Sequence, residues 1–173
     1  MKDYWIISDT HFGHQNIITY CKRPFYSYLE MDTALIDNWN RVVKKEDYVY
    51  HLGDFFMEEP RSEKEANYRD YILASLNGRI TLILGNHDKV NYLAKTGRFH
   101  DIVMWKPWNV SKNNPPFLMT HVPVHKDSIL WEAREGFNLH GHTHNFGSPK
   151  GPYKCACVEL INYTPKNIEE LYD

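Results

Sequence analysis

The sequence predicts an α/β protein in which helices lie outside two facing β-sheets. In the N-terminal half, apolar strand-like segments alternate with segments of helical periodicity, whereas the strand-like segments of the C-terminal half follow one another closely. Segment 79–84 is an almost continuous apolar run, which is typical of a strand covered on both faces. This combination fits helices on the outer faces of two sheets, and 173 residues are enough for a single domain, 1–173, that folds unaided.

Helical periodicity is clearest over 30–43, where apolar residues from Met31 to Val42 recur on one helix face. Further helices are expected beside Pro and Gly, because proline starts or interrupts a helix and Asn77-Gly78 favours the end of one. They are predicted over 17–21, 60–77 and 90–96, with helical turns over 126–134 and a short helix after Pro165.

Strands are expected where β-branched and apolar residues run together between turn signals. The predicted strands cover 5–8, 47–52, 79–84, 99–105, 117–120, 137–140 and 153–163. Pro107 and the cluster 113–116 are typical of loops, so the chain between 105 and 117 is predicted to be a loop.

The charge balance limits the possible partners. With 20 Lys and Arg against 22 Asp and Glu, the net charge of −2 argues against a broad electrostatic grip on nucleic acid, although it leaves room for a local basic pocket. No apolar run approaches the ~20 residues needed to span a membrane, so no membrane partner is expected. The chain enters a strand directly, and we therefore expect no signal peptide and a cytoplasmic protein.

The three cysteines are an odd number, which indicates reduced thiols. Cys155 and Cys157 would share one face of a strand and could bind a soft metal. Two ligands alone make a poor metal site, so a structural role is favoured for this pair.

Metal-type side chains follow the ends of five predicted strands. Sites in open α/β sheets form at the carboxyl ends of strands, and oxygen and imidazole donors suit borderline divalent metals. Glycines stand beside three of these positions, where a missing side chain lets the backbone approach closely. Each motif alone also fits an ordinary polar strand end, but their joint occurrence predicts a metal centre. The residues are Asp9, His11, Asp54, Asn86, His87, His121, His142 and His144.

The order of these motifs resembles the signature of the calcineurin-like metallophosphoesterases. Asp-x-His, Gly-Asp, Gly-Asn-His-Asp, His and Gly-His-x-His occur in that order between Asp9 and His144. Segments 8–14, 23–25, 38–40 and 50–54 further resemble a small, capless bacterial and phage branch of predicted phosphoesterases. The resemblance implies a four-layered α/β/β/α sandwich of two mixed sheets flanked by helices, with a centre of two divalent metal ions.

The resemblance also implies a role for each motif residue. One metal ion would be held by Asp9, His11 and His144, and the other by Asn86, His121 and His142. Asp54 would bridge the two ions, and a hydroxide that bridges both would be the nucleophile, with no covalent enzyme intermediate. Manganese is expected first, with Fe, Zn, Co or Ni as alternatives, because the ligands contain no thiolate.

His87 is expected to act in catalysis rather than as a ligand. It follows Asn86, so its imidazolium can face the leaving oxygen and stabilise charge or donate a proton there. Asp88 is expected to orient His87, as neighbouring carboxylates orient histidines.

Two further residues are candidates for substrate binding. His14, in the loop above the site, either contacts the substrate phosphate or is an ordinary solvated loop histidine. Arg23 is the best cationic candidate for a phosphate clamp, because guanidinium matches phosphate oxygens bidentately, and a surface salt bridge is the alternative. Three other histidines are expected to pack or to support the ligands rather than bind metal: His51, His125 and His140.

The expected function is hydrolysis of a phosphoester, with phosphodiesters favoured over protein phosphates because no cap domain is evident. Small phosphodiesters, cyclic nucleotides and nucleic-acid ends are the candidate substrates, and the lack of a basic excess weakens the alternative of a nuclease acting on nucleic-acid ends. A catalytically silent metal-binding scaffold is the other alternative, and the presence of every ligand together with His87 counts against it. The physiological substrate and the oligomeric state stay open.

Overall fold

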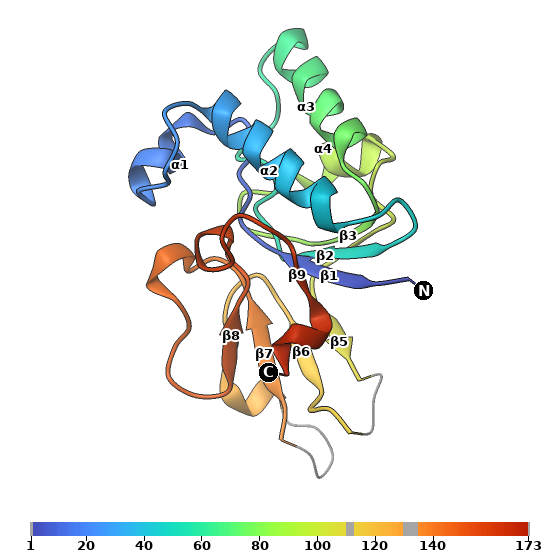
Figure 1. Cartoon of the computed structure of the whole chain (residues 1–173), viewed down its shortest axis with the longest axis vertical. Helices are drawn as coiled ribbons and strands as arrows, with labels where there is room; N and C mark the ends of the chain where they lie inside the picture. Colours follow the sequence, from blue (N-terminus) through green and yellow to red (C-terminus); the bar gives the residue numbers. More distant parts are fainter. Residues whose placement is uncertain (1, 110–112, 130–134, 173) are drawn as a thin grey trace.

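The structure is a computed structural model that describes residues 2–109, 113–129 and 135–172. Two β-sheets face each other (Figure 1). The five-stranded sheet has the order β4 (Asp101–Val103), β3 (Arg79–Ile83), β2 (Tyr48–His51), β1 (Tyr4–Ile7) and β9 (Lys166–Asn167). The four-stranded sheet has the order β5 (Lys106–Trp108), β6 (Phe117–Met119), β7 (Phe137–His140) and β8 (Tyr153–Cys155).

Each sheet is parallel except at one edge. Strands β1 to β4 run parallel, and β9 pairs antiparallel with β1. Strands β6 to β8 run parallel, and β5 pairs antiparallel with β6. Within each sheet the carboxyl ends of the parallel strands therefore lie together, and this placement allows their following loops to meet.

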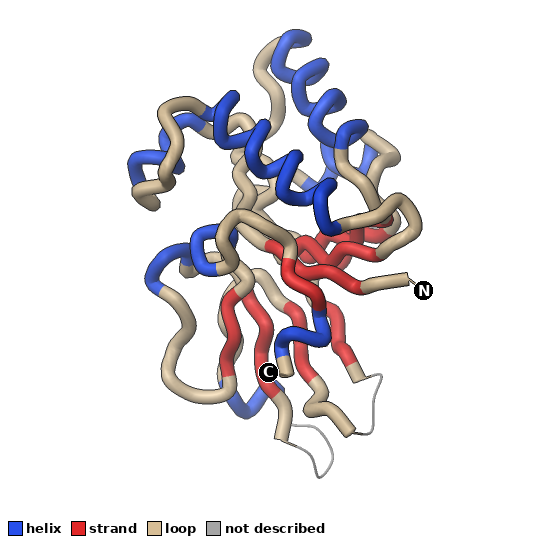
Figure 2. Tube along the Cα trace, in the orientation of Figure 1, coloured by secondary structure: helices blue, strands red, loops and turns tan. Residues whose placement is uncertain are grey.

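The longer helices cover the outer face of the five-stranded sheet, as the blue tubes of Figure 2 show. They are α2 (Tyr28–Val42), α3 (Glu63–Ser75) and α4 (Val90–Lys95), while α1 (Gln15–Tyr20) lies to the left of the strands in Figure 1. Ser27 and Ser62 cap the starts of α2 and α3 by accepting backbone N–H bonds, which satisfies donors that have no partner inside the helix. Short 3-10 turns complete the chain: η1 (Lys126–Ile129), η2 (His144–Phe146), η3 (Val158–Leu160) and η4 (Ile168–Leu171).

Two apolar cores fill the spaces between the layers. In the first, Leu35 and Trp39 of α2 pack with residues of the five-stranded sheet such as Val49. In the second, Ile6 of the five-stranded sheet packs with Phe117 of the four-stranded sheet, together with other residues of both. The predicted α/β sandwich of two mixed sheets flanked by helices is confirmed.

The layer outside the four-stranded sheet is thin in the described parts of the chain. Helical turns were predicted over 126–134, and the structure has η1 there, while residues 130–134 lie outside the described residues. No helix among the described residues combines the length and the apolar character that a membrane crossing requires.

Three strand predictions are corrected. The strand predicted over 153–163 ends at Cys155, because η3 turns the chain. Pro107 lies in strand β5 rather than in a loop, which is possible because an edge strand tolerates a residue without an N–H. A two-residue edge strand, β9, precedes η4 where only a helix was predicted.

Candidate metal centre

The predicted metal ligands lie on the loops that follow five parallel strands: β1 and β2, β3, β6 and β7. Positive φ angles, uncommon outside glycine, occur at five of these ligands. They are Asp9 (58°), His11 (49°), Asp54 (55°), His142 (68°) and His144 (47°). Such a concentration of left-handed backbone means that the surrounding fold holds these turns in place, as is typical of functional sites.

Glycines let these loops approach one another. A Cβ atom on Gly53 would lie 2.6 Å from the backbone nitrogen of Gly85, and a Cβ atom on Gly141 would collide with Ser8 and Asp9. These separations are too small for any side chain, so the site can close only with glycine at these positions.

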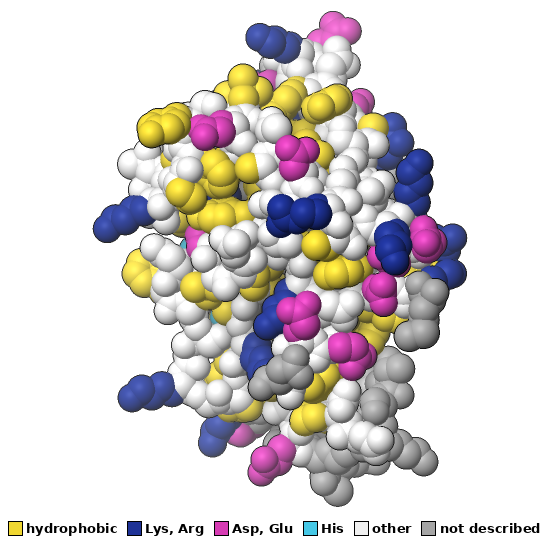
Figure 3. All heavy atoms as spheres, viewed as in Figure 1, with side chains coloured by type: hydrophobic (Ala, Val, Ile, Leu, Met, Phe, Trp, Pro, Cys, Tyr) yellow, Lys and Arg dark blue, Asp and Glu magenta, His cyan; other side chains and the backbone are white. Residues whose placement is uncertain are grey.

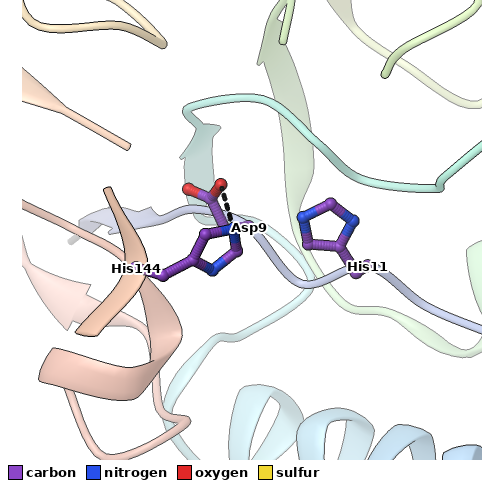
Figure 4. Close-up of side chains that lie close together, drawn as sticks. All are labelled: Asp9, His11 and His144. Carbon is purple, nitrogen blue, oxygen red and sulfur yellow. Dashed lines mark ion pairs between the residues drawn. The ribbon is translucent and has the colours of Figure 1, made fainter. Parts of the chain in front are cut away.

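Asp9, His11 and His144 form the first donor group, whose ligand atoms lie within 4.8 Å of one another (Figure 4). Asp9 Oδ2 accepts hydrogen bonds from Ser8 Oγ (2.5 Å), His142 N (2.9 Å) and Cys157 Sγ (3.2 Å). Asp9 Oδ1 is left facing the site, 3.6 Å from His144 Nε2. This oxygen and both ring nitrogens of His11 are buried and have no hydrogen-bond partner among the described residues.

Asn86, His121 and His142 form the second donor group. His121 Nδ1 lies 2.8 Å from the carbonyl oxygen of Leu52, which can only accept, so the proton is on Nδ1 and Nε2 keeps its lone pair. His121 Nε2 lies 2.9 Å from Asn86 Oδ1 and 3.2 Å from His142 Nδ1. The three side chains therefore aim donor atoms at one region.

Asp54 lies between the two groups. Its Oδ1 accepts the backbone N–H of His87 at 2.9 Å. Its Oδ2 lies 3.6 Å from His11 Nε2 and 3.4 Å from His121 Nε2. One carboxylate oxygen thus faces a histidine of each group.

Burial and nearby charges set the protonation of these ligands. Burial lowers the pKa of His11 well below its usual range, which leaves a neutral imidazole with a free lone pair. Burial would raise the pKa of Asp54, but His121, His11 and the N–H of His87 outweigh it, so the pKa falls and the group stays a carboxylate. Against burial, hydrogen bonds with Cys21 and Glu159 and the charge of Asp9 raise the pKa of His144 to about 10.

A family model of the calcineurin-like phosphoesterases matches residues 3–103. The chain belongs to this family. Membership implies metal-dependent hydrolysis of phosphoesters, and the donor groups described above are candidate metal-binding residues of such an enzyme.

Relatives of this phosphoesterase come from archaea, bacteria and phages. It is 36% identical to the uncharacterized protein MJ1445 of Methanocaldococcus jannaschii, over 98% of this chain and 89% of that protein. It is 27% identical to the Gene 66 protein of Mycobacterium phage D29, over 84% of this chain and 80% of that protein. The crystal structure of AQ665 from Aquifex aeolicus, a protein of unknown function, has a TM-score of 0.72 and 26% identity, with 99% of this chain and 98% of that one covered.

Arg23 of the phosphoesterase supports the first donor group through hydrogen bonds to its main chain. The sequence prediction that it clamps the substrate phosphate is corrected. The residue is only 4% exposed. Its guanidinium donates to the carbonyl oxygens of Asp9 (2.7 Å) and Thr10 (2.9 Å), and twice to Glu159 Oε1 (2.7 and 2.9 Å). With these partners the group faces inward and is not available to a substrate.

Glu159 is a site residue that sequence reasoning missed. Its Oε1 also accepts from His144 Nδ1 at 3.0 Å, which turns His144 Nε2 toward Asp9. Cys21 joins these two residues in a third cluster of metal-type side chains. Glu159 lies 136 positions from Arg23 in the sequence, and a pair so far apart forms no local motif that could identify it.

Asp88 positions the loops around Asp54, and its predicted role in orienting the His87 ring stays a prediction. Its carboxylate accepts the backbone N–H groups of Asp54 (2.8 Å), Phe55 (3.0 Å) and Gly85 (2.9 Å). Burial raises the pKa of Asp88 to about 6. The three hydrogen bonds to this carboxylate connect the loop after β2 with the loop after β3.

The other histidines divide into those at the site and those that support the fold. The rings of His87 and His14 lie 5.7 Å and 5.8 Å from the ring of His11, so both border the first donor group. His51 is fully buried and bonds to Thr10 Oγ1, and burial lowers its pKa to about 3. His140 lies against the carbonyl oxygen of Gly141.

The remaining predicted candidates lie away from the metal ligands or only support them. The His125 side chain is 72% exposed and pairs with Asp127. The thiols of Cys155 and Cys157 lie 3.2 Å apart, and in the described part of the chain they join no cluster of metal-type side chains. Cys157 instead donates to Asp9, which is the structural role that the sequence favoured.

Proposed function

We propose that this chain hydrolyses a phosphoester, with phosphodiesters favoured, at a centre that holds two divalent metal ions. The observation that supports this most is the position of Asp54 Oδ2, which lies 3.4 Å and 3.6 Å from histidine nitrogens of the two donor groups. A shared carboxylate oxygen is the ligand that a paired-metal site needs. Oxygen and imidazole donors without a thiolate admit Mn, Fe, Zn, Co or Ni, and this proposal takes Mn²⁺ first.

The residues fit such ions. Asp9, His11 and His144 would hold one ion, and Asn86, His121 and His142 the other, with Asp54 between them. Buried donor atoms without partners, such as Asp9 Oδ1, are costly unless a cation satisfies them. When bound, the two ions would act as Lewis acids that lower the pKa of water and offset the charge of the phosphate.

The chain's own residues prepare the reaction in three ways. The hydrogen bond from His87 N to Asp54 Oδ1 leaves Oδ2 for the metals. The same bond holds the main chain of His87, from which the imidazole ring extends. We assign the His87 ring to the leaving oxygen, which it can protonate or stabilise. His14, on the same side of the site, is assigned to the substrate phosphate.

The face of the molecule drawn in Figure 3 gives no support to a nuclease. On the face drawn in Figure 3, basic and acidic side chains are interspersed, without a single basic patch. A polyanionic strand is held mainly by Lys and Arg, so a small phosphoester is the favoured substrate.

The proposal is tested with the Mn²⁺-loaded chain and bis(4-nitrophenyl) phosphate. Asp54→Asn should lower turnover more than about 100-fold and reduce the bound metal from two equivalents, because it removes the shared ligand. Asp127→Asn, an exposed aspartate beside His125, is the matched control and should change neither quantity. A wild-type chain that binds two equivalents but hydrolyses no phosphomonoester, phosphodiester, cyclic nucleotide or oligonucleotide would contradict the proposal.

His87→Ala separates catalysis from metal binding. It should keep both metal equivalents by elemental analysis while losing about 10²–10⁴ in rate, the range of a positioned general acid. Unchanged turnover would remove His87 from the mechanism.

A further inference from the structure

A large cavity adjoins the second donor group. Its volume is about 900 Å³, and Asn86, Asp88 and His121 are among the residues that line it. The cavity is therefore continuous with the proposed metal centre. It also falls within the roughly 300–1,000 Å³ of pockets that hold small organic ligands.

Most of the lining is apolar. Leu84, Val90, Met104, Trp105, Leu118 and Val124 contribute to it. No lysine or arginine is among the described residues that line the cavity, so these residues offer no cation to a second phosphate group. A bound group without charge is favoured in such surroundings.

Two of the polar side chains in the lining are committed to internal partners. Thr120 Oγ1 donates to the carbonyl oxygen of Val122 (2.7 Å) and accepts from Asn138 (2.9 Å). Asp88 accepts three backbone N–H groups of the metal-centre loops. Neither of these two side chains has a donor left for a ligand, so apolar contact dominates in this part of the lining.

Two large apolar side chains of the lining are open to solvent. Trp105 is 60% exposed and Met104 68% exposed, in the connection between β4 and β5. A flat indole and a flexible thioether are suited to cover an apolar group of varied shape. Val122 and Val90, 44% and 43% exposed, extend the same apolar lining.

We propose that this cavity binds the organic group of the substrate, and that this group is an uncharged alkyl or aryl substituent of a small phosphoester. The inference rests on the proposed function, because it places the phosphate at the metal centre and the substituent beside Asn86 and His121. It narrows the substrate class to phosphoesters with an apolar end, and it assigns specificity to Trp105 and Val90.

The test uses non-hydrolysable alkylphosphonates, from methyl to hexyl, bound to the Mn²⁺-loaded full chain and followed by calorimetry. The dissociation constant should fall about threefold to fourfold per added methylene, the value for burial of one CH₂ group. Trp105→Ala and Val90→Trp should each weaken hexylphosphonate at least tenfold and leave methylphosphonate unchanged. Tyr71→Ala, an aromatic that is 61% exposed on α3, is the control and should change neither ligand.

The outcomes separate this proposal from the function on which it rests. The cavity proposal would be overturned if the dissociation constant did not depend on the length of the alkyl group, or if that dependence were the same in both variants. Methylphosphonate would still bind at the metal centre in either case. If methylphosphonate does not bind and no phosphoester is hydrolysed, the proposed function fails, and the cavity is then tested with 1-naphthol and the metal-free chain. Binding of 1-naphthol that Val90→Trp abolishes would support the cavity, and no binding would overturn it. Dimerisation that depends on Trp105, with no effect of alkyl length on binding, would show that a second copy of the protein covers this surface. That result would also overturn the cavity proposal.

Discussion

The two donor groups of the metal centre are held by different parts of the structure. Asp9 and His11 are 0% and 2% exposed, and Arg23 and Cys157 support Asp9 from distant segments of the chain. In the second group Asn86 and His142 are exposed, and His121 is anchored to the main chain at Leu52. The first group is thus supported by side chains from other segments of the chain, whereas His121 of the second group is held by the main chain after β2.

This difference assigns the groups separate tasks. The first group is supported where the segment after α1, which carries Arg23, contacts η3, which carries Glu159. Such a site depends on the complete tertiary structure. The second group opens to the apolar cavity and can meet a ligand without a change in the core.

The largest effect is expected at Arg23. Arg23→Met removes the arginine partner of the buried Glu159 and leaves two carbonyl oxygens without a donor, so the free energy of unfolding should fall by about 3–5 kcal/mol. Urea denaturation of the metal-free chain measures this change.

Two further variants sharpen the result. Arg41→Met, an exposed arginine of α2, should change the stability by less than about 0.5 kcal/mol. The double variant Arg23→Met with Glu159→Leu should recover much of the loss, because no unpaired charge remains. A loss below about 1 kcal/mol for Arg23→Met alone would mean that the first group does not depend on this brace.

The fold was predictable to the extent that local pattern fixes it. The helix over 30–43 and the strand over 79–84 match α2 and β3 because periodicity and apolar runs are local signals. Strands β5 and β9 have three and two residues and exist through pairing with a neighbour, which leaves no local signal.

The same distinction applies to the site. The structure brings the predicted ligands together because each follows a parallel strand, and the carboxyl ends of these strands in the two facing sheets lie beside one site. Arg23 was assigned to the substrate because its charge is visible in the sequence while its burial is not. Its partner Glu159 could be found only from the fold, since no spacing rule connects them.

A pH dependence is expected from a third support of the first group. Asp32 of α2 accepts the N–H of Gly13 and the hydroxyl of Tyr68, both at 2.8 Å, and thereby holds the loop that carries His14. Burial raises the pKa of Asp32 from 3.8 to about 7. Its neutral form stabilises the fold fully below pH 3.8, and this contribution is lost as the pH rises through 7.

Asp32→Asn keeps an acceptor without the charge. Its free energy of unfolding, relative to that of the wild type, should increase between pH 4 and pH 8 by an amount on the order of 2 kcal/mol. Asp37→Asn, an exposed residue of the same helix, should show no such trend. Denaturation curves across this pH range provide the measurement, and parallel curves for Asp32→Asn and the wild type would mean that the buried carboxyl is not strained at neutral pH.

The smallest effect, and the most selective one, is expected at Glu159. Glu159→Gln preserves the size of the side chain but weakens its bonds to Arg23 and His144, so the affinity of the first group for Mn²⁺ should fall about 10-fold to 100-fold. The second group shares no residue with Glu159, and its affinity should stay unchanged. A Mn²⁺ titration followed by electron paramagnetic resonance resolves the two steps, with Glu46→Gln, an exposed glutamate, as the control. Equal losses at both steps would show that the two groups respond as one unit, coupled through Asp54, and that their different supports do not make them independent.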